Sequence, residues 1–172
     1  TDKRLKTISE MGIKPIDRRQ FPDLDFDEQK YAADPVYKKA YLASEEIFLE
    51  LVKKNTLGLG VSIFIDYVGS PVIRATLRAL ARQGVVTTAG WKEGMKISSV
   101  RAIECIQRHI HIHTHYARYA QGRAAVRFAE DTGWLPTIDS EVYSFDNIPQ
   151  LAADYASGKN SAYFPMFQIN QL

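Results

Sequence analysis

The stretch VSIFIDYVGSPVIRATLRALARQGVVTTAG, residues 61–90, decides the fold that this sequence predicts. Residues 61–69 are a short β-branched and aromatic run with little alternation, which is typical of a strand buried on both faces. Pro71 then favours the start of a helix that Gly84 ends, and residues 85–90 form a second buried run. A strand, a crossover helix and a second strand in this order indicate a parallel sheet with right-handed connections.

The same alternation extends along the rest of the chain. Toward the amino terminus, hydrophobic spacing predicts helices over residues 2–11 and 34–54, with a polar loop over residues 20–33. Toward the carboxyl terminus, we expect helices near 100–107, 116–132 and 146–158, and strands at 110–114, within 135–145 and at 163–170. The predicted fold class is therefore α/β, a parallel sheet with helices on both faces.

Composition narrows the class of protein. Of the 172 residues, 45% are apolar and 24% are charged, which is ordinary for a soluble globular domain. A net charge of +2 without a basic run argues against a nucleic-acid partner, and the apolar stretches are too short to span a membrane. The single cysteine, Cys105, cannot form an internal disulfide, so we expect a cytoplasmic protein. Because the chain starts at Thr1, it is expected to be a fragment, a processed product or a trimmed chain.

The order of these segments resembles the second half of the medium-chain dehydrogenases/reductases, the family of zinc alcohol dehydrogenases and quinone reductases. The segments that carry the resemblance are DKRLKTISEMG (2–12) followed by IDR (16–18), FIDYVGSPVIRATLRALARQGVVTTAG (64–90), IHIHTHYARYAQG (110–122) and VYSFDNIPQLAADYASGK (142–159). The acidic insertion before residue 64 and the sequence His115-Tyr116-Ala117-Arg118-Tyr119 are similar to the crotonyl-CoA carboxylase/reductase and acrylyl-CoA reductase branch.

This resemblance implies a carboxyl-terminal fragment, because the family's G-x-G-x-x-G turn and its amino-terminal β domain do not occur in these residues. We therefore expect a partial Rossmann-type sheet that lacks the first strand and its phosphate loop. Residues 1–134 would form the cofactor-binding region, with a helical insertion at about 20–56. Residues 135–172 would return toward the missing catalytic domain. The isolated chain is expected to be inactive, and its partner to be another copy or the remainder of a larger chain.

In the family, the end of the second strand selects between NAD and NADP, and Lys3, Arg4 and Arg18 lie where that choice is made. The guanidinium of an arginine suits a phosphate because it donates two parallel charged hydrogen bonds. The resemblance thus implies NADP, bound chiefly by Arg4 and Arg18 and less by Lys3 or Arg19. The alternative is that Lys3 and Arg4 are solvated helix charges.

Four more candidate cofactor residues close the two strands of residues 61–90: Val68, Gly69, Ala89 and Gly90. Ligands of open parallel sheets lie outside the carboxyl ends of the strands, and glycine lets the backbone approach a ribose or nicotinamide. Ordinary turn chemistry is the alternative. The resemblance also places Lys159, in a glycine-lysine turn, near the nicotinamide.

The histidines alternate at positions 109, 111, 113 and 115, so on a strand all four would share one face. Such spacing allows a transition-metal site, but no carboxylate or cysteine ligand stands nearby, and no metal is assigned. His115 differs, because the resemblance implies an active-site position, where it would help to hold carbon dioxide or serve proton transfer. The alternative is that it caps the next helix.

The implied chemistry is hydride transfer from NADPH to the β carbon of an enoyl-CoA thioester. The enolate would then be trapped by a proton or by carbon dioxide, and the sequence does not separate these two outcomes. Two alternatives from other classes stay open. One is a non-catalytic assembly domain with a reductase-like sheet, and the other is a metal-binding module that uses the alternating histidines.

Overall fold

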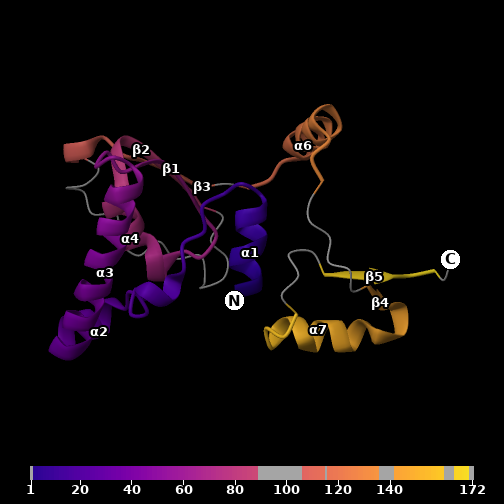
Figure 1. Ribbon diagram of the computed structural model, residues 1–172, viewed down its shortest axis with the longest axis horizontal. Coiled ribbons are helices and arrows are strands. Elements are labelled where there is room, and N and C mark those ends of the chain that lie inside the picture. Colours follow the sequence, from indigo (N-terminus) through magenta and orange to yellow (C-terminus); the bar gives the residue numbers. More distant parts are fainter. Residues whose placement is uncertain (1, 89–105, 115, 136–141, 161–164, 171–172) are drawn as a thin grey trace. The chain divides into compact units, whose positions relative to one another are not determined.

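A computed structural model describes residues 2–88, 106–114, 116–135, 142–160 and 165–170 (Figure 1). The chain divides into two compact units. One contains residues 17–116, and the other contains residues 1–16 and 117–172. Each unit is described by itself below. The boundary expected near residue 134 stays a prediction, and the helix expected near 100–107 lies largely outside the described residues.

A parallel sheet forms the centre of the unit 17–116. Its strands are β1 (Val61–Asp66), β2 (Leu80–Thr88) and β3 (His111–Thr114), and they lie in the order β1-β2-β3. Both pairings are parallel. The α/β class and the parallel sheet predicted from residues 61–90 are therefore confirmed, and the carboxyl ends of all three strands lie at one edge.

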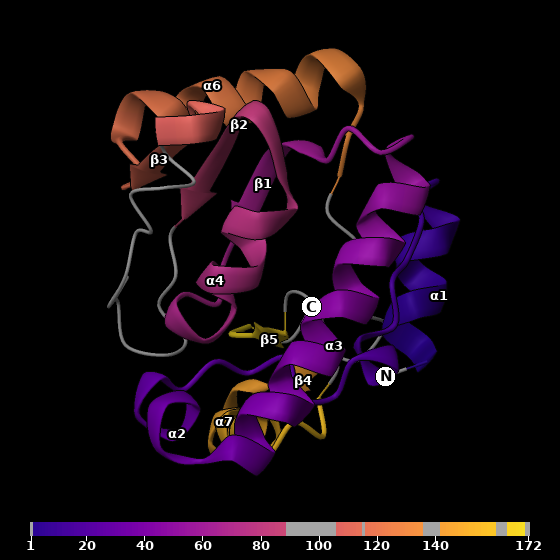
Figure 2. The same ribbon diagram turned by 90° about the vertical axis from the view of Figure 1, so that its left-hand side faces the viewer.

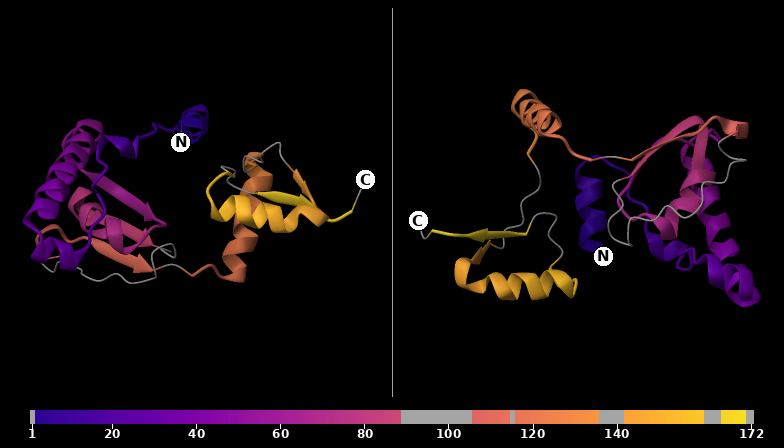
Figure 3. Two further views of the ribbon diagram at one scale, coloured as in Figure 1. Left: turned by 90° about the horizontal axis from the view of Figure 1, so that it is seen from below. Right: turned by 180° about the vertical axis from the view of Figure 1, so that it is seen from behind.

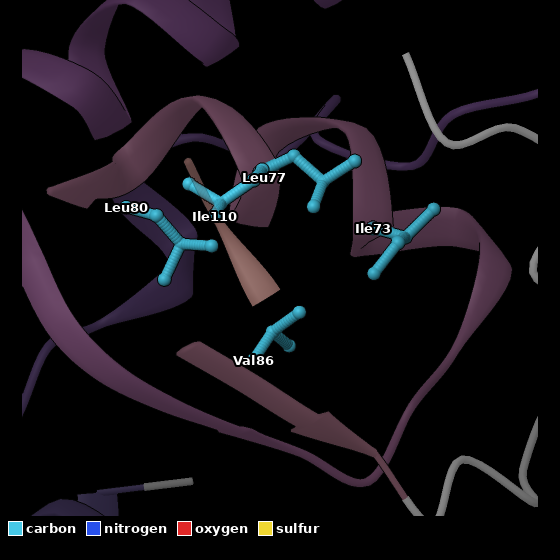
Figure 4. Close-up of a cluster of buried hydrophobic side chains, with 5 residues drawn as sticks. All are labelled: Ile73, Leu77, Leu80, Val86 and Ile110. Atoms are coloured by element: carbon cyan, nitrogen blue, oxygen red, sulfur yellow. The ribbon is translucent and has the colours of Figure 1, made fainter. Parts of the chain in front are cut away.

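The helix α4 (Ser70–Ala79) connects β1 to β2 and packs on one face of this sheet (Figure 2). Side chains from the helix and the strands meet in one buried cluster, Ile73, Leu77, Leu80, Val86 and Ile110 (Figure 4). Phe64 and Ile112 pack against it from β1 and β3. Burial of each such side chain stabilises the unit by about 1.5–3 kcal/mol. The cluster thereby fixes the helix on the strands.

Two side chains of β1 that point away from α4 are exposed to solvent. Ile63 and Ile65 are 68% and 60% exposed, whereas Phe64 packs on the cluster under α4. The sequence predicted a strand buried on both faces. The exposed fractions differ from that expectation because α4 packs on the other side of the sheet from these two isoleucines.

The end of α4 also differs from the prediction. The helix ends at Ala79 and not at Gly84, and Leu80 already has extended backbone (φ −64°, ψ 144°). The guanidinium of Arg108 donates to the carbonyls of Leu77 (2.5 Å) and Leu80 (2.7 Å). It therefore satisfies carbonyl groups that are left without helical partners where α4 stops.

A helical insertion precedes β1. It consists of α2 (Glu28–Ala33) and α3 (Pro35–Asn55), so the loop predicted over residues 20–33 is wrong for its second half. The carboxylate of Asp27 caps α2 by accepting from the amide of Lys30 (3.0 Å). Asp34 caps α3 in the same way, accepting from the amides of the next turn. These two N-caps allow helices to begin within a polar, acidic stretch of sequence.

A buried charged network attaches the insertion to α4. Tyr41 and Glu45 on α3 are fully buried, and the Glu45 carboxylate pairs with Arg74 (3.3 Å) and Arg78 of α4. It also accepts from the hydroxyl of Tyr41 (3.1 Å). Burial, together with the nearby charge of Glu45, raises the pKa of Tyr41. The network therefore holds α3 against α4.

Aromatic rings complete this contact between the insertion and α4. The guanidinium of Arg74 lies over the rings of Phe26, Tyr31 and Tyr41, at 5.2, 4.9 and 5.8 Å from their centroids. The three rings also contact one another edge-on or tilted, with centroids 5.2–5.8 Å apart. Arg74 is thus held by a carboxylate on one side and by ring faces on another.

The unit of residues 1–16 and 117–172 contains separate helices and a small sheet (Figure 3). Its helices are α1 (Asp2–Glu10), α6 (Tyr119–Thr132) and α7 (Ile148–Ala156). The strands β4 (Val142–Ser144) and β5 (Met166–Gln168) pair in parallel. The helices and strands expected in these regions are confirmed, with shorter bounds. No helix in the described part of the chain is both long and apolar enough to cross a membrane.

Candidate functional site

A cavity of about 240 Å³ lies at the carboxyl end of β1, within the unit 17–116. One side is the turn that connects β1 to α4, and the other is the short helix η1 (Arg18–Gln20) with the residues after it. The lining residues are Arg18, Phe21, Pro22, Leu24, Asp25, Val68, Pro71 and Val72. The carboxyl edge of a parallel sheet is the usual ligand position in this class of fold.

The turn between β1 and α4 is organised by Asp66, the last residue of β1. Its carboxylate is buried and accepts from the amide of Val68 (2.9 Å). The amide of Gly69 donates to both carboxylate oxygens (3.2 and 3.1 Å). Gly69 has φ 99°, a backbone conformation that favours glycine. The chain can therefore turn sharply from the strand into α4 beside the cavity.

The opposite side of the cavity is the 21–25 loop, defined here as residues 21–25 after η1. The amide of Phe26, the residue that follows this loop, donates to the carbonyl of Pro71 in the first turn of α4 (2.8 Å). The amide of Asp23 donates to the hydroxyl of Ser44 on α3 (3.2 Å). Bonds donated by main-chain amides thus hold the loop against both α4 and the insertion.

Two adjacent arginines lie in η1, just before this loop, and they differ in their partners. Arg19 pairs with the carboxylate of Asp17, with Nε–Oδ2 at 2.8 Å and a second nitrogen at 2.5 Å. Hydrogen bonds from Arg19 hold the pKa of Asp17 below its usual value. Arg18 lines the cavity and forms no ion pair with the residues that the structure describes. Arg18 is therefore the guanidinium available to an anion in the cavity.

The structure brings some of the predicted cofactor residues together. Arg18 and Val68 line the same cavity, and Gly69 follows Val68 in the turn. Ala89 and Gly90 lie outside the described residues, as does the predicted catalytic residue His115. Their roles stay predictions.

The remaining candidates belong to the other unit. Lys3 and Arg4 lie exposed in the first turn of α1. Lys159 follows α7, with its Nζ 4.0 Å from the carboxylate of Asp154. Their participation in cofactor binding also stays a prediction.

The alternating histidines form a shorter row than the sequence predicted. The rings of His111 and His113 on β3 stack with centroids 6.4 Å apart and planes inclined by 26°. His109 has φ 53° and precedes the strand, so it does not continue the alternation. Across the part of the chain that the structure describes, no three His, Cys, Asp or Glu side chains gather as a metal site would require.

Two features of the cavity were not found from the sequence. The 21–25 loop was interpreted as a polar connection, and its place beside α4 depends on main-chain bonds that leave no pattern of residue types. Asp66 was interpreted only as part of a strand. A usable signal existed, since an aspartate often accepts from the amide two residues ahead and so stabilises a turn.

Comparison with known proteins gives a match in structure alone. No family model matches the chain, and no curated protein matches it. The crotonyl-CoA carboxylase/reductase AntE, solved in complex with NADP, is similar over 94% of this chain and 40% of that chain, with 16% identity and a TM-score of 0.76.

Two alcohol dehydrogenases are also similar. The enzyme from the hyperthermophilic archaeon Aeropyrum pernix matches over 92% of this chain and 38% of that chain, with 17% identity and a TM-score of 0.64. An alcohol dehydrogenase superfamily protein from Novosphingobium aromaticivorans matches over 98% and 46%, with 18% identity and a TM-score of 0.62. The chain thus spans less than half the length of these proteins. At such identities the likeness shows a shared fold, the partial Rossmann-type α/β arrangement.

Proposed function

We propose that the chain is part of an NADP-dependent oxidoreductase of the medium-chain dehydrogenase/reductase type, and that the cavity binds the adenosine end of the cofactor. The observation that carries this proposal is that Arg18 and Val68, far apart in sequence, line one cavity at the carboxyl end of β1. The shared fold with AntE, a protein solved in complex with NADP, supports it.

The residues present fit that part of the cofactor. Phe21, Leu24 and Val68 offer apolar surface to a flat base, and Arg18 offers a fork of donors to a phosphate. The volume of about 240 Å³ is below the roughly 300–1,000 Å³ of pockets that enclose drug-sized ligands. The cavity therefore suits one end of a dinucleotide. In this proposal Arg18, with Arg4 and Lys3, selects NADP through its additional phosphate.

We further propose that the complete protein reduces an enoyl-CoA thioester. Bound NADPH would supply the hydride for the β carbon, and the enolate would receive a proton or carbon dioxide. In this proposal His115 serves proton transfer or holds carbon dioxide, while Ala89, Gly90 and Lys159 lie along the nicotinamide half. The support is the sequence around His115 together with the structural likeness to a crotonyl-CoA carboxylase/reductase. A cytoplasmic location and assembly with another copy or a larger chain belong to the same proposal.

The test compares two nucleotides that differ in one phosphate. Adenosine 2′,5′-bisphosphate carries the adenosine end of NADP, and AMP carries that of NAD. Arg18→Met should weaken binding of the bisphosphate by about 10- to 100-fold, because a hydrogen bond to a charged group contributes about 1.5–3 kcal/mol. Its effect on AMP should stay within about threefold, since Arg18 is assigned to the phosphate and not to the base.

Isothermal titration calorimetry on the full chain measures both affinities. Arg19→Met is the matched control, because Arg19 is adjacent but pairs with Asp17. It should change both affinities much less than Arg18→Met changes that of the bisphosphate, because the carboxylate of Asp17 engages the Arg19 guanidinium. If Arg18→Met weakened the binding of both nucleotides by the same factor, the assignment of Arg18 to the additional phosphate would be contradicted. A wild-type chain that binds neither nucleotide would refute nucleotide binding and favour the assembly-domain alternative.

A further inference from the structure

We propose that Asp66 is a positioning residue for the bound nucleotide, acting through the turn of Val68 and Gly69. This proposal rests on the proposed function of the cavity. Asp66 is 2% exposed and is not one of the residues that line the cavity. Any effect that it has on a ligand must therefore pass through the groups that it holds.

The carboxylate of Asp66 accepts from consecutive main-chain amides of the turn. Oδ1 accepts from the amide of Val68 at 2.9 Å and from that of Gly69 at 3.2 Å, while Oδ2 accepts from Gly69 at 3.1 Å. Hydrogen bonds to an ionised carboxylate are about twice as strong as neutral ones. Held in this way, the two peptide groups keep one orientation relative to β1.

That orientation determines one side of the cavity. Val68 lines the cavity directly, and Pro71 and Val72, also lining residues, follow Gly69 at the start of α4. Gly69 is the N-cap residue of α4 and has no side chain with which to cap it. The amide of Val72 donates to the carbonyl of Gly69 (3.1 Å), which links the turn to the first turn of the helix. Asp66 therefore fixes the side of the cavity formed by Val68, Pro71 and Val72.

The hydrogen bonds to Asp66 also determine which main-chain donors of the turn are available to a ligand. The amides of Val68 and Gly69 are both engaged by Asp66, so the turn offers its apolar side chain to the nucleotide and not these two donors. The phosphate is then left to Arg18 on the opposite side of the cavity. Asp66 acts on the part of the ligand that contacts the turn, which adenosine 2′,5′-bisphosphate and AMP have in common.

The variant Asp66→Asn tests this role because it keeps the size of the side chain. One carboxylate oxygen becomes an NH₂ group, so the bond from the Gly69 amide to Oδ2 is replaced by two donors that face each other, and the negative charge that strengthens the bonds to Oδ1 is lost. We expect both nucleotides to bind about tenfold more weakly, by equal factors. This pattern differs from that of Arg18→Met, which affects the bisphosphate alone.

Val86→Ala provides the matched control for a purely structural effect. Val86 is buried in the cluster under α4 and does not line the cavity. It should lower the Tm of the chain and leave both Kd values within about twofold of the wild type. Binding by Asp66→Asn within twofold of the wild type would overturn the proposal for Asp66 and leave the proposed function intact. No binding by the wild type would overturn both.

A second measurement uses the wild type alone and does not depend on how well a variant folds. Hydrogen exchange followed by NMR reports on the amides of Val68 and Gly69 with and without saturating adenosine 2′,5′-bisphosphate. If the turn that Asp66 holds contacts the nucleotide, exchange at these two amides should slow by about tenfold on binding. Unchanged exchange at both amides, with the nucleotide bound, would refute the proposal.

Discussion

Glu45→Ala is the change expected to destabilise the unit 17–116 most directly. The Glu45 carboxylate is fully buried between α3 and α4, and it pairs with Arg74 and Arg78. Its removal leaves the guanidinium groups of Arg74 and Arg78 without this carboxylate and the Tyr41 hydroxyl without its acceptor. The perturbation therefore creates uncompensated charge at the contact between the insertion and α4.

The magnitude follows from how well each partner is shielded from water. Removing one member of a buried ion pair costs about 3–5 kcal/mol. The Arg74 side chain is 17% exposed, so the loss of its ion pair with Glu45 costs nearly the full amount. The Arg78 side chain is 38% exposed, so the loss of its ion pair adds little after solvent screening. The lost bond from Tyr41 adds about 1 kcal/mol. We expect a decrease of about 4–6 kcal/mol in the free energy of unfolding, the sum of these two contributions.

Urea unfolding followed by circular dichroism measures this free energy, and hydrogen-exchange mass spectrometry assigns the loss to peptides from α3 and α4. Glu46→Ala is the control, because Glu46 is the exposed neighbour and its loss should cost less than about 0.5 kcal/mol. A decrease below about 1 kcal/mol in Glu45→Ala would refute the reasoning. It would mean that the network behaves as a solvated surface cluster.

Two further predictions concern the same unit. Because the pKa of Tyr41 is raised in the folded state, its contribution to stability is complete below the usual tyrosine pKa of about 10 and declines as the pH rises above it. Tyr41→Phe should therefore reduce the fall of the urea midpoint between about pH 9 and 11, and a slope equal to that of the wild type would contradict this. Arg108→Met should lower stability by about 1–2 kcal/mol and speed hydrogen exchange at the last turn of α4, since the carbonyls of Leu77 and Leu80 lose their donor. Unchanged exchange there would show that water replaces the guanidinium without loss.

The parallel sheet could be predicted because its strands are short apolar runs separated by a helix that Pro71 starts. Their β-branched and apolar residue types and their short length make such runs recognisable, even though Ile63 and Ile65 of β1 are exposed. The end of α4 could not be predicted, because it depends on Arg108, which reaches the helix from a distant segment. The loop predicted over residues 20–33 missed α2, since its many acidic residues mask the capping role of Asp27.

Only part of the candidate site could be predicted, because several of its features depend on hydrogen bonds to the backbone. Arg18 and Val68 are cofactor candidates through the resemblance, and the structure places both on one cavity, Arg18 in η1 and Val68 after β1. Asp66 accepts from main-chain amides of the turn through its carboxylate, and the 21–25 loop is held by bonds from its own main-chain amides. Bonds of that kind depend on backbone geometry, and residue types report them poorly.

The way the 21–25 loop is held has a consequence for evolution and for redesign. The bonds that place it use the amides of Asp23 and Phe26 and the carbonyl of Asp25, which accepts from the hydroxyl of Tyr37. The side chains of Leu24 and Asp25 can therefore be exchanged without moving the backbone that carries them. Under the proposed function, single substitutions at these two positions would change the nucleotide preference of the cavity while the surrounding scaffold stays unchanged.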